Sequence, residues 1–183
     1  MADESLVERK TRETTIRLEL KRGEGKSDVS TGVPFLDHMM VAFSRYSGLD
    51  LSLKAEGDLR HHTIEDVAIA MGAAVAELLG PSAARYGERT VPMDEALVQA
   101  CLDMGGRPYY RGPLPSTLYD HWMRSFADNS KTTLHLRVLR GTDRHHIVEA
   151  AFKALGLAIR DAMRDTGSGA VFSTKGSVDI KVR

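Results

Sequence analysis

The order of polar and apolar positions predicts the same series of elements twice along the chain. Alternation with a period of two predicts strands, and apolar residues that recur every three or four positions predict helices. In the first half, these patterns predict strands over residues 14–20 and 29–33, a helix over 35–46, a strand over 49–55 and a helix over 63–79. Gly48 follows the first helix in the position of a C-cap, and Gly80 with Pro81 ends the second.

The second half of the chain repeats this order. It carries predicted strands over residues 96–104 and 108–111, a helix over 118–127, a strand over 132–139 and a helix over 147–163. Each half is therefore β-β-α-β-α, which predicts an α+β fold whose helices cover a sheet. We expect half-repeats at residues 1–92 and 93–183 within one compact unit, with a Gly- and Ser-rich tail that could end in a strand over 178–182.

Histidine motifs recur in register with these elements. Two adjacent histidine pairs lie 84 residues apart, and each is followed at the same distance by a glutamate: His61, His62 and Glu65, and His145, His146 and Glu149. Upstream of each pair stands an Asp-His dipeptide, which ends in His38 in the first half and in His121 in the second. Recurrence of two motifs in the same order and at nearly the same offset indicates an internal duplication.

The spacing of the histidine and glutamate positions favours metal binding. Residues four apart lie on one face of a helix, so His61 with Glu65, and His145 with Glu149, can bind one ion together. The second histidine of each pair projects roughly 100° away and would serve another ion, on a neighbouring half or subunit. Imidazole with carboxylate suits manganese, iron or zinc. The alternative is that the histidines are solvated residues at a helix start, and their recurrence argues against it.

Composition and charge narrow the class of protein. The hydrophobic fraction of 42% and the charged fraction of 27% are typical of a globular chain. The 25 basic residues balance the 25 acidic ones, which argues against nucleic-acid binding and favours association with further copies. Cys101 is the lone cysteine, which indicates a reducing cytoplasm, and we expect it in the core. No stretch reaches the about 20 apolar residues of a membrane span.

Other polar residues carry weaker signals. His135 stands in an alternating strand and is interpreted as a surface residue rather than a ligand. Arg85 and Arg107 lie in glycine-containing, loop-like segments, where forked donors could hold a phosphate, although surface arginines are usually only solvated. The run Ser173 to Gly176 is similar to a phosphate-binding turn but lacks the full P-loop spacing.

Four runs of the sequence resemble the imidazoleglycerol-phosphate dehydratase family of histidine biosynthesis. They are TGVPFLDHM at 31–39, HHTIED at 61–66, HHIVEAAFKA at 145–154 and STKG at 173–176. The resemblance extends from about residue 12 to residue 176. It implies two α/β halves similar to the second domain of ribosomal protein S5, trimers that assemble into a 24-subunit cage, and two manganese ions in each active site formed between subunits.

The resemblance also implies roles for particular residues. The implied metal ligands are His38, His61, His62, Glu65, His121, His145, His146 and Glu149. Glu13 matches a glutamate that contacts substrate, and Lys153 lies in a segment near it. The implied ligands of the substrate phosphate are Arg85, Arg107, Ser173 and Lys175.

The reaction implied is that of a hydro-lyase, which removes water from imidazoleglycerol phosphate to give imidazole acetol phosphate. The proton that leaves carbon has no carbonyl beside it, so the reaction needs metal and a positioned carboxylate. Glu13 is our candidate for that proton transfer, with Glu65 or Glu149 as alternatives. A metal-binding cage without catalysis and a di-metal hydrolase are the other functions considered, and consumption of the substrate distinguishes them.

Overall fold

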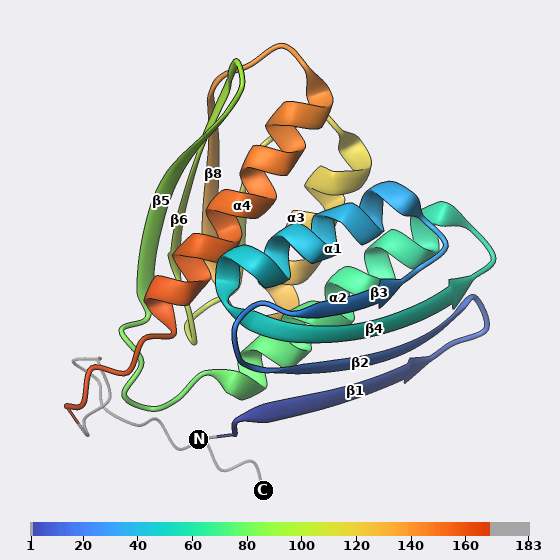
Figure 1. Ribbon diagram of the computed structural model, residues 1–183, viewed down its shortest axis with the longest axis horizontal. Helices are drawn as coiled ribbons and strands as arrows, with labels where there is room; N and C mark the ends of the chain where they lie inside the picture. Colours follow the sequence, from blue (N-terminus) through green and yellow to red (C-terminus); the bar gives the residue numbers. More distant parts are fainter. Residues whose placement is uncertain (1, 169–183) are drawn as a thin grey trace, which may run out of the picture.

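The computed structural model describes residues 2–168, which form two sheets and four helices (Figure 1). The first half contains β1 (Glu4–Lys10), β2 (Thr14–Arg22), β3 (Ser27–Ser30), α1 (Pro34–Ser47), β4 (Leu49–Gly57) and α2 (Arg60–Leu78). The second half contains β5 (Tyr86–Met93), β6 (Ala96–Asp103), β7 (Tyr109–Arg111), α3 (Thr117–Asn129), β8 (Thr133–Arg140) and α4 (Arg144–Ala162). The strand expected over 178–182, Ser173 and Lys175 lie outside the described residues.

The two sheets have the same topology, which confirms the duplicated α+β fold. Their strand orders are β1-β2-β4-β3 and β5-β6-β8-β7, and in each the last strand of the order pairs in parallel with its neighbour while the others pair antiparallel. Each half has one strand more than the sequence pattern predicts, β1 and β5. These are edge strands that expose most side chains: only Ser5 is buried in β1, and Gly87 and Val91 in β5. An edge strand with so few buried positions lacks the apolar alternation that identifies strands.

The division between the halves follows from strand pairing. β5 pairs along its whole length with β6 and therefore belongs to the second sheet. The boundary expected between residues 92 and 93 falls inside this strand. The predicted helix starts at residues 63 and 147 are also later than the observed starts at Arg60 and Arg144, so both histidine pairs lie in the first helical turn.

The four helices lie between the two sheets (Figure 1). α2 packs on the strands of the first sheet, and α4 packs on β5 and β6 of the second. The remaining helices cross over, because α1 packs against α4 and α3 packs against α2. Each half therefore places its first helix against the last helix of the other half, which brings together side chains that are far apart in sequence.

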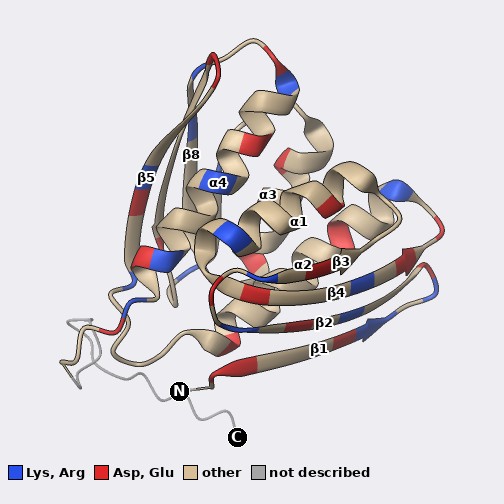
Figure 2. Ribbon diagram, viewed as in Figure 1, with Lys and Arg blue, Asp and Glu red and all other residues tan. Residues whose placement is uncertain are grey.

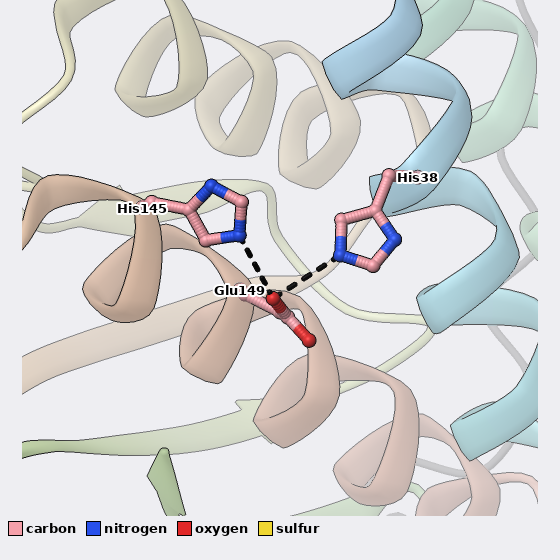
Figure 3. Close-up of side chains that lie close together, drawn as sticks. All are labelled: His38, His145 and Glu149. Carbon is pink, nitrogen blue, oxygen red and sulfur yellow. Dashed lines mark hydrogen bonds and ion pairs between the residues drawn. The ribbon is translucent and has the colours of Figure 1, made fainter. Parts of the chain in front are cut away.

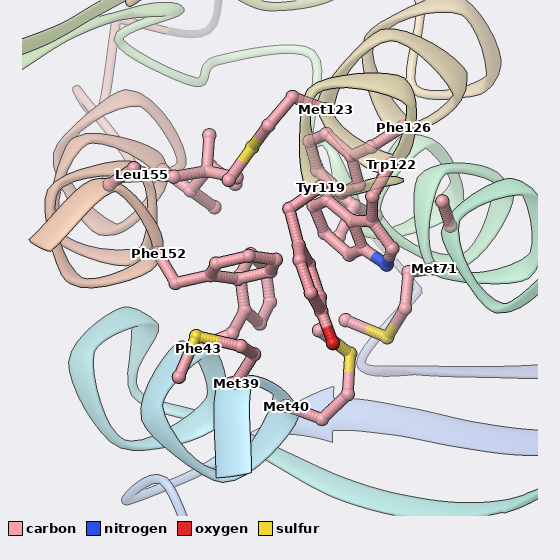
Figure 4. Close-up of a cluster of buried hydrophobic side chains, with 14 of the residues drawn as sticks. Met39, Met40, Phe43, Met71, Tyr119, Trp122, Met123, Phe126, Phe152 and Leu155 are labelled. Carbon is pink, nitrogen blue, oxygen red and sulfur yellow. The ribbon is translucent and has the colours of Figure 1, made fainter. Parts of the chain in front are cut away.

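Aromatic and methionine side chains fill the space between the helices (Figure 4). The ring of Trp122 stacks on Phe126 with centroids 5.2 Å apart, and its other neighbour is Phe152 at 4.6 Å. All three side chains are fully buried, and burial of each stabilises the fold by roughly 1.5–3 kcal/mol. This shared core fixes the spacing of the helices that carry the histidines.

Glycines allow the closest helix approaches. A Cβ atom on Gly72 of α2 would lie 2.7 Å from the Phe126 carbonyl oxygen of α3, and one on Gly156 of α4 would lie 3.1 Å from the Phe43 carbonyl oxygen of α1. The two glycines occupy equivalent places in the halves, as do the two phenylalanines. Both crossings thus depend on a position without a side chain.

The outer surfaces of the sheets are polar. Figure 2 shows basic and acidic residues interspersed along β1, β2 and β4. On the outer face of the second sheet, His135 is exposed as expected, and Cys101 is its neighbour across the β6–β8 pairing. The expectation of a core position for Cys101 was wrong, because β6 turns Ala100 and Leu102 inward and Cys101 outward, where it is half-buried. None of the described helices has the length and apolar character needed to cross a bilayer.

Candidate metal centres

The first cluster of candidate ligands joins α1 to α4. Glu149 Oε2 lies 3.1 Å from His38 Nε2 and 3.2 Å from His145 Nε2. His145 and Glu149 come from successive turns of α4, as the four-residue spacing predicts, whereas His38 reaches in from α1 of the other half (Figure 3). The three side chains converge on one point.

The second cluster repeats this arrangement with the halves exchanged. Glu65 Oε2 lies 3.5 Å from His61 Nε2 on α2, and its Oε1 lies 3.6 Å from His121 Nε2 on α3. The ring centroids of His61 and His121 are 5.4 Å apart, close to the 5.9 Å between His38 and His145. Each cluster therefore takes a histidine and a glutamate from one half and a histidine from the other.

Aspartates next to two of the ligands fix the helix starts. Asp37 Oδ1 accepts hydrogen bonds from the Thr31 backbone N–H and hydroxyl, at 2.9 and 2.6 Å. In the second half, Asp120 Oδ1 accepts from the Tyr110 hydroxyl at 2.6 Å and from the Leu114 backbone N–H at 2.8 Å. These bonds tie the first turns of α1 and α3 to the chain segments that precede them, including β7, and so orient the adjoining histidines.

Lys153 stabilises the negative charge of Glu149, the carboxylate of the first cluster. Its Nζ lies 2.8 Å from Glu149 Oε1, one helical turn away, which leaves Oε2 for the two histidines. The residue Glu149 is 6% exposed, and this burial alone would raise its pKa. The hydrogen bonds from Lys153 and His38 outweigh burial, so the pKa of Glu149 lies below its ordinary value. Glu149 is therefore anionic at neutral pH, as a metal ligand must be.

The second histidine of each pair stays outside both clusters. His62 Nδ1 lies 2.8 Å from Asp58 Oδ1 and 3.8 Å from Glu13 Oε2. Glu13 belongs to the turn between β1 and β2. The hydrogen bond to Asp58 raises the pKa of His62. The divergence of adjacent helix positions, which the sequence predicts, is thus present in the structure.

His146 has an equivalent pair of acidic neighbours in the turn between β5 and β6. Its Nδ1 lies 2.7 Å from Glu95 and its Nε2 lies 3.4 Å from Asp94. The Asp143 backbone N–H and then His146 lower the pKa of Glu95 to about 2, and Glu95 in turn raises the pKa of His146. Sequence reasoning missed Asp58, Asp94 and Glu95. The sequence signals these residues only by position. Asp94 and Glu95 are adjacent acidic residues in a turn, and Asp58 stands three residues before the first histidine pair.

The arginines expected to bind phosphate lie at the other end of the molecule. The Arg85 guanidinium donates to Asp103 Oδ1 at 2.9 Å and to the Met104 carbonyl at 3.0 Å. A Cβ on Gly106 would lie 3.5 Å from Arg85 Nη2, so Arg85 is next to the loop that carries the exposed Arg107. The Arg85 backbone N–H donates to the Ala162 carbonyl at the end of α4, about 20 Å from the glutamate of the first cluster by the helical rise.

Both clusters fit a first-row divalent cation. Within the described part of the chain, two groups of three histidine or acidic residues have ligand atoms within 4.8 Å of one another, and these are the two clusters. Two imidazoles with one carboxylate suit manganese, iron or zinc, and a three-residue set leaves coordination positions for other groups. The histidine side chains of the first cluster are 48% and 50% exposed, so such groups can approach from outside the subunit.

Comparisons with known proteins agree with this arrangement. A family model described as imidazoleglycerol-phosphate dehydratase matches residues 31–159, a range that includes both clusters. An imidazoleglycerol-phosphate dehydratase of Parafrankia is 45% identical, over 96% of this chain and 99% of its own length. The protein of the same name from Acetivibrio thermocellus is 46% identical, over 93% and 96%.

Solved structures show the same similarity. A crystal structure of IGPD from Pyrococcus furiosus superposes with a TM-score of 0.84 and 38% identity, over 94% of this chain and all of that one. The imidazoleglycerol-phosphate dehydratase of Staphylococcus aureus gives a TM-score of 0.80 and 31% identity, over 89% of this chain and 99% of its own.

Proposed function

Since the chain belongs to the imidazoleglycerol-phosphate dehydratase family and is a hydro-lyase of histidine biosynthesis, we propose that it uses manganese at its two clusters to convert imidazoleglycerol phosphate into imidazole acetol phosphate. The observation that carries this proposal is the repetition of the ligand set. Each half contributes to both clusters, and each cluster offers two imidazoles and a carboxylate. An imidazole ring, with a nitrogen on either side, is a substrate that two ions can bind at once.

The bound cation would supply acidity: on a ring nitrogen it lowers the pKa of the imidazole and so assists loss of the neighbouring hydroxyl. His38, His145 and Glu149 would hold one ion, and His61, Glu65 and His121 would hold the other. Six of the eight expected ligands would thus bind ions within their own subunit.

The proton on carbon needs a carboxylate that is not occupied elsewhere. Glu149 is held by Lys153 and two histidines, and Glu65 lies between two histidines, which favours ligand roles for both. The Glu13 side chain is 56% exposed, and its Oε2 lies 3.8 Å from His62 Nδ1, beyond hydrogen-bonding distance. We therefore assign the proton transfer to Glu13.

The substrate phosphate requires residues from more than one subunit. Arg85 and Arg107 are our candidates for its ligands, together with Ser173 and Lys175. The separation of about 20 Å along α4 between Arg85 and the first cluster is much longer than the three-carbon chain that joins ring to phosphate. We infer that one active site combines the clusters of one subunit with the arginines of another.

We propose further that subunits complete the metal centres of one another. His62 and His146, the remaining two expected ligands, lie outside the clusters of their own chain and would bind ions held by neighbours. Trimers that assemble into a 24-subunit particle would provide such contacts. The lone cysteine favours a reducing cytoplasm as the location.

The test is turnover by the purified chain after metal is removed by chelation. We expect the metal-free protein to be inactive and manganese to restore formation of the enolisable ketone from imidazoleglycerol phosphate. His145→Asn should abolish turnover, whereas the matched His135→Asn, on the outer face of the second sheet, should leave it intact. Full activity without divalent metal, or no ketone with any divalent metal, would contradict the proposal.

A further inference from the structure

The two histidines outside the clusters each form a hydrogen bond with a carboxylate that has no role in the proposed function. His62 Nδ1 lies 2.8 Å from Asp58 Oδ1, and His146 Nδ1 lies 2.7 Å from Glu95 Oε2. We propose that Asp58 and Glu95 are positioning residues that keep the ring proton on Nδ1 and so leave the lone pair of Nε2 for a metal ion. This inference rests on the proposed metal-dependent function.

The bonds of Glu95 determine its orientation. Its Oε1 accepts hydrogen bonds from the backbone N–H groups of Thr142 and Asp143, at 3.1 and 2.8 Å, while Oε2 faces the ring of His146. An ionised carboxylate can only accept, so the hydrogen atom of the third bond belongs to His146 Nδ1. The Glu95 side chain therefore fixes the loop before α4. It also fixes the tautomer of His146, which lies in the first turn of that helix.

The rings of the two outer histidines diverge from those of the neighbouring cluster histidines. The rings of His145 and His146 are nearly perpendicular, at 88°, with centroids 5.9 Å apart. The rings of His61 and His62 stand at 84° and 6.1 Å. Among the residues that the structure describes, neither His62 nor His146 belongs to a group of candidate ligand atoms within 4.8 Å of one another, so its Nε2 is placed for an ion other than the one that its neighbour would bind. A hydrogen bond from Nδ1 to a carboxylate is the usual way in which proteins orient a metal-binding histidine through Nε2.

Asp58 holds its histidine less tightly than Glu95 does. It lies four residues before His62, its side chain is 53% exposed, and it bonds to the ring through Oδ1. Two backbone N–H groups of the loop before α4 fix Oε1 of Glu95, whereas the dominant hydrogen bond of the Asp58 carboxylate is the one from His62, with weaker contributions from the backbone N–H groups of Leu59 and of Asp58 itself. An amide at position 58 can therefore turn its oxygen toward Nδ1, whereas an amide at position 95 cannot.

This difference makes a sharp test. In Glu95→Gln, the amide oxygen must still accept from the two backbone N–H groups, so the NH₂ group faces His146 Nδ1 and donates to it. The ring proton then moves to Nε2, where Asp94 at 3.4 Å can accept it. We expect the Mn²⁺ affinity of the full-length protein to fall about 10–100-fold, with an unchanged far-ultraviolet circular dichroism spectrum.

Three further variants serve as controls. Glu88→Gln alters a glutamate of β5 that bonds to Gln99, away from both histidine pairs, and should retain parental affinity. Asp58→Ala should weaken Mn²⁺ binding, and Asp58→Asn should restore most of it, because asparagine can offer an oxygen to Nδ1. Two exchanges of an acid for its amide, at positions 58 and 95, thus have opposite expected results.

The tautomer itself can be read by nitrogen-15 NMR of the metal-free, histidine-labelled protein at a pH where the rings are neutral. We expect the proton of His146 on Nδ1 in the parent and on Nε2 in Glu95→Gln. Parental Mn²⁺ affinity in Glu95→Gln, or an unchanged tautomer even with weaker binding, would overturn the inference. A parent that binds no Mn²⁺ would refute the proposed function instead, and the tautomers would still decide the roles of Asp58 and Glu95.

Discussion

Carboxylates divide the six histidines of the repeated motifs into two kinds. Glu65 and Glu149 each face two histidines through Nε2 and form the clusters with them. Asp58 and Glu95 instead face a single histidine each, through Nδ1. A histidine with an acidic neighbour thus forms part of a ligand set where Nε2 faces the carboxylate. It forms an orienting contact where Nδ1 faces the carboxylate.

The Glu95–His146 pair predicts a pH dependence of stability in the metal-free protein. The pKa of Glu95 is lowered from 4.5 to about 2, so its contribution is present above pH 4.5 and is lost as the pH falls toward 2. The pKa of His146 is raised above 6.5, so its contribution is present below pH 6.5 and is lost as the pH rises through the raised value. The pair should stabilise the fold most between these limits.

Urea unfolding of the parent and Glu95→Gln at pH 3, 5.5 and 8 measures this effect. The difference in free energy of unfolding between the two proteins should be largest at pH 5.5 and smaller on both sides. A difference that is the same at all three values would show that the charges of Glu95 and His146 do not contribute, and that only uncharged packing distinguishes the two proteins.

The phosphate site leads to a kinetic prediction. If Arg107 and Lys175 bind the phosphate, Arg107→Ala and Lys175→Ala should each raise KM roughly tenfold or more, because each removes a charge-assisted hydrogen bond. The manganese content of the variants should equal that of the parent, since neither Arg107 nor Lys175 is an expected metal ligand. Steady-state kinetics with metal analysis checks both expectations, and an unchanged KM would remove the altered residue from the site.

Elements with a buried stripe were predictable from the sequence, and those without one were not. The four helices lie where apolar residues recur at helical spacing, and the four-residue interval placed His145 with Glu149 correctly. β1 and β5 were missed because edge strands bury so few side chains. The partner of each HHxxE motif was also unpredictable, since it depends on the crossing of α1 with α4 and of α3 with α2.

The helix crossings predict opposite signs for two effects of alanine at Gly72. Alanine favours a helix over glycine by about 1 kcal/mol. A Cβ at this position would nevertheless lie 2.7 Å from a backbone oxygen of α3, and such overpacking typically costs about 1–3 kcal/mol. We expect the clash to dominate, so Gly72→Ala should lower the free energy of unfolding, and Gly156→Ala, with 3.1 Å available, should lower it less.

Chemical denaturation of the metal-free variants measures these energies. Gly106→Ala is the control, because its Cβ would meet no atom closer than 3.5 Å. A more stable Gly72→Ala variant would mean that the helices separate easily, and that the close crossing does not set the position of His121.

For the whole molecule, duplication explains how one chain supplies two similar centres. The two halves exchange their first helices, so neither cluster can form from one half alone. The backbone of Arg85 bonds to the far end of α4, about 20 Å along the helix from the glutamate of the first cluster. Local sequence patterns cannot supply that separation, because it depends on how the sheet and helix run side by side. It is the structural reason why we propose an active site between subunits.

The most direct test of shared metal centres is the particle size with and without divalent metal, measured by size-exclusion chromatography with light scattering and metal analysis. If ions are bound between subunits, they stabilise the contacts that complete their own sites. Metal-free protein should fall to trimers, and manganese should restore the large particle. His62→Asn and His146→Asn should each lose about one ion per subunit together with assembly, while His135→Asn loses neither. Metal-free protein that keeps its full size would contradict centres completed across subunits.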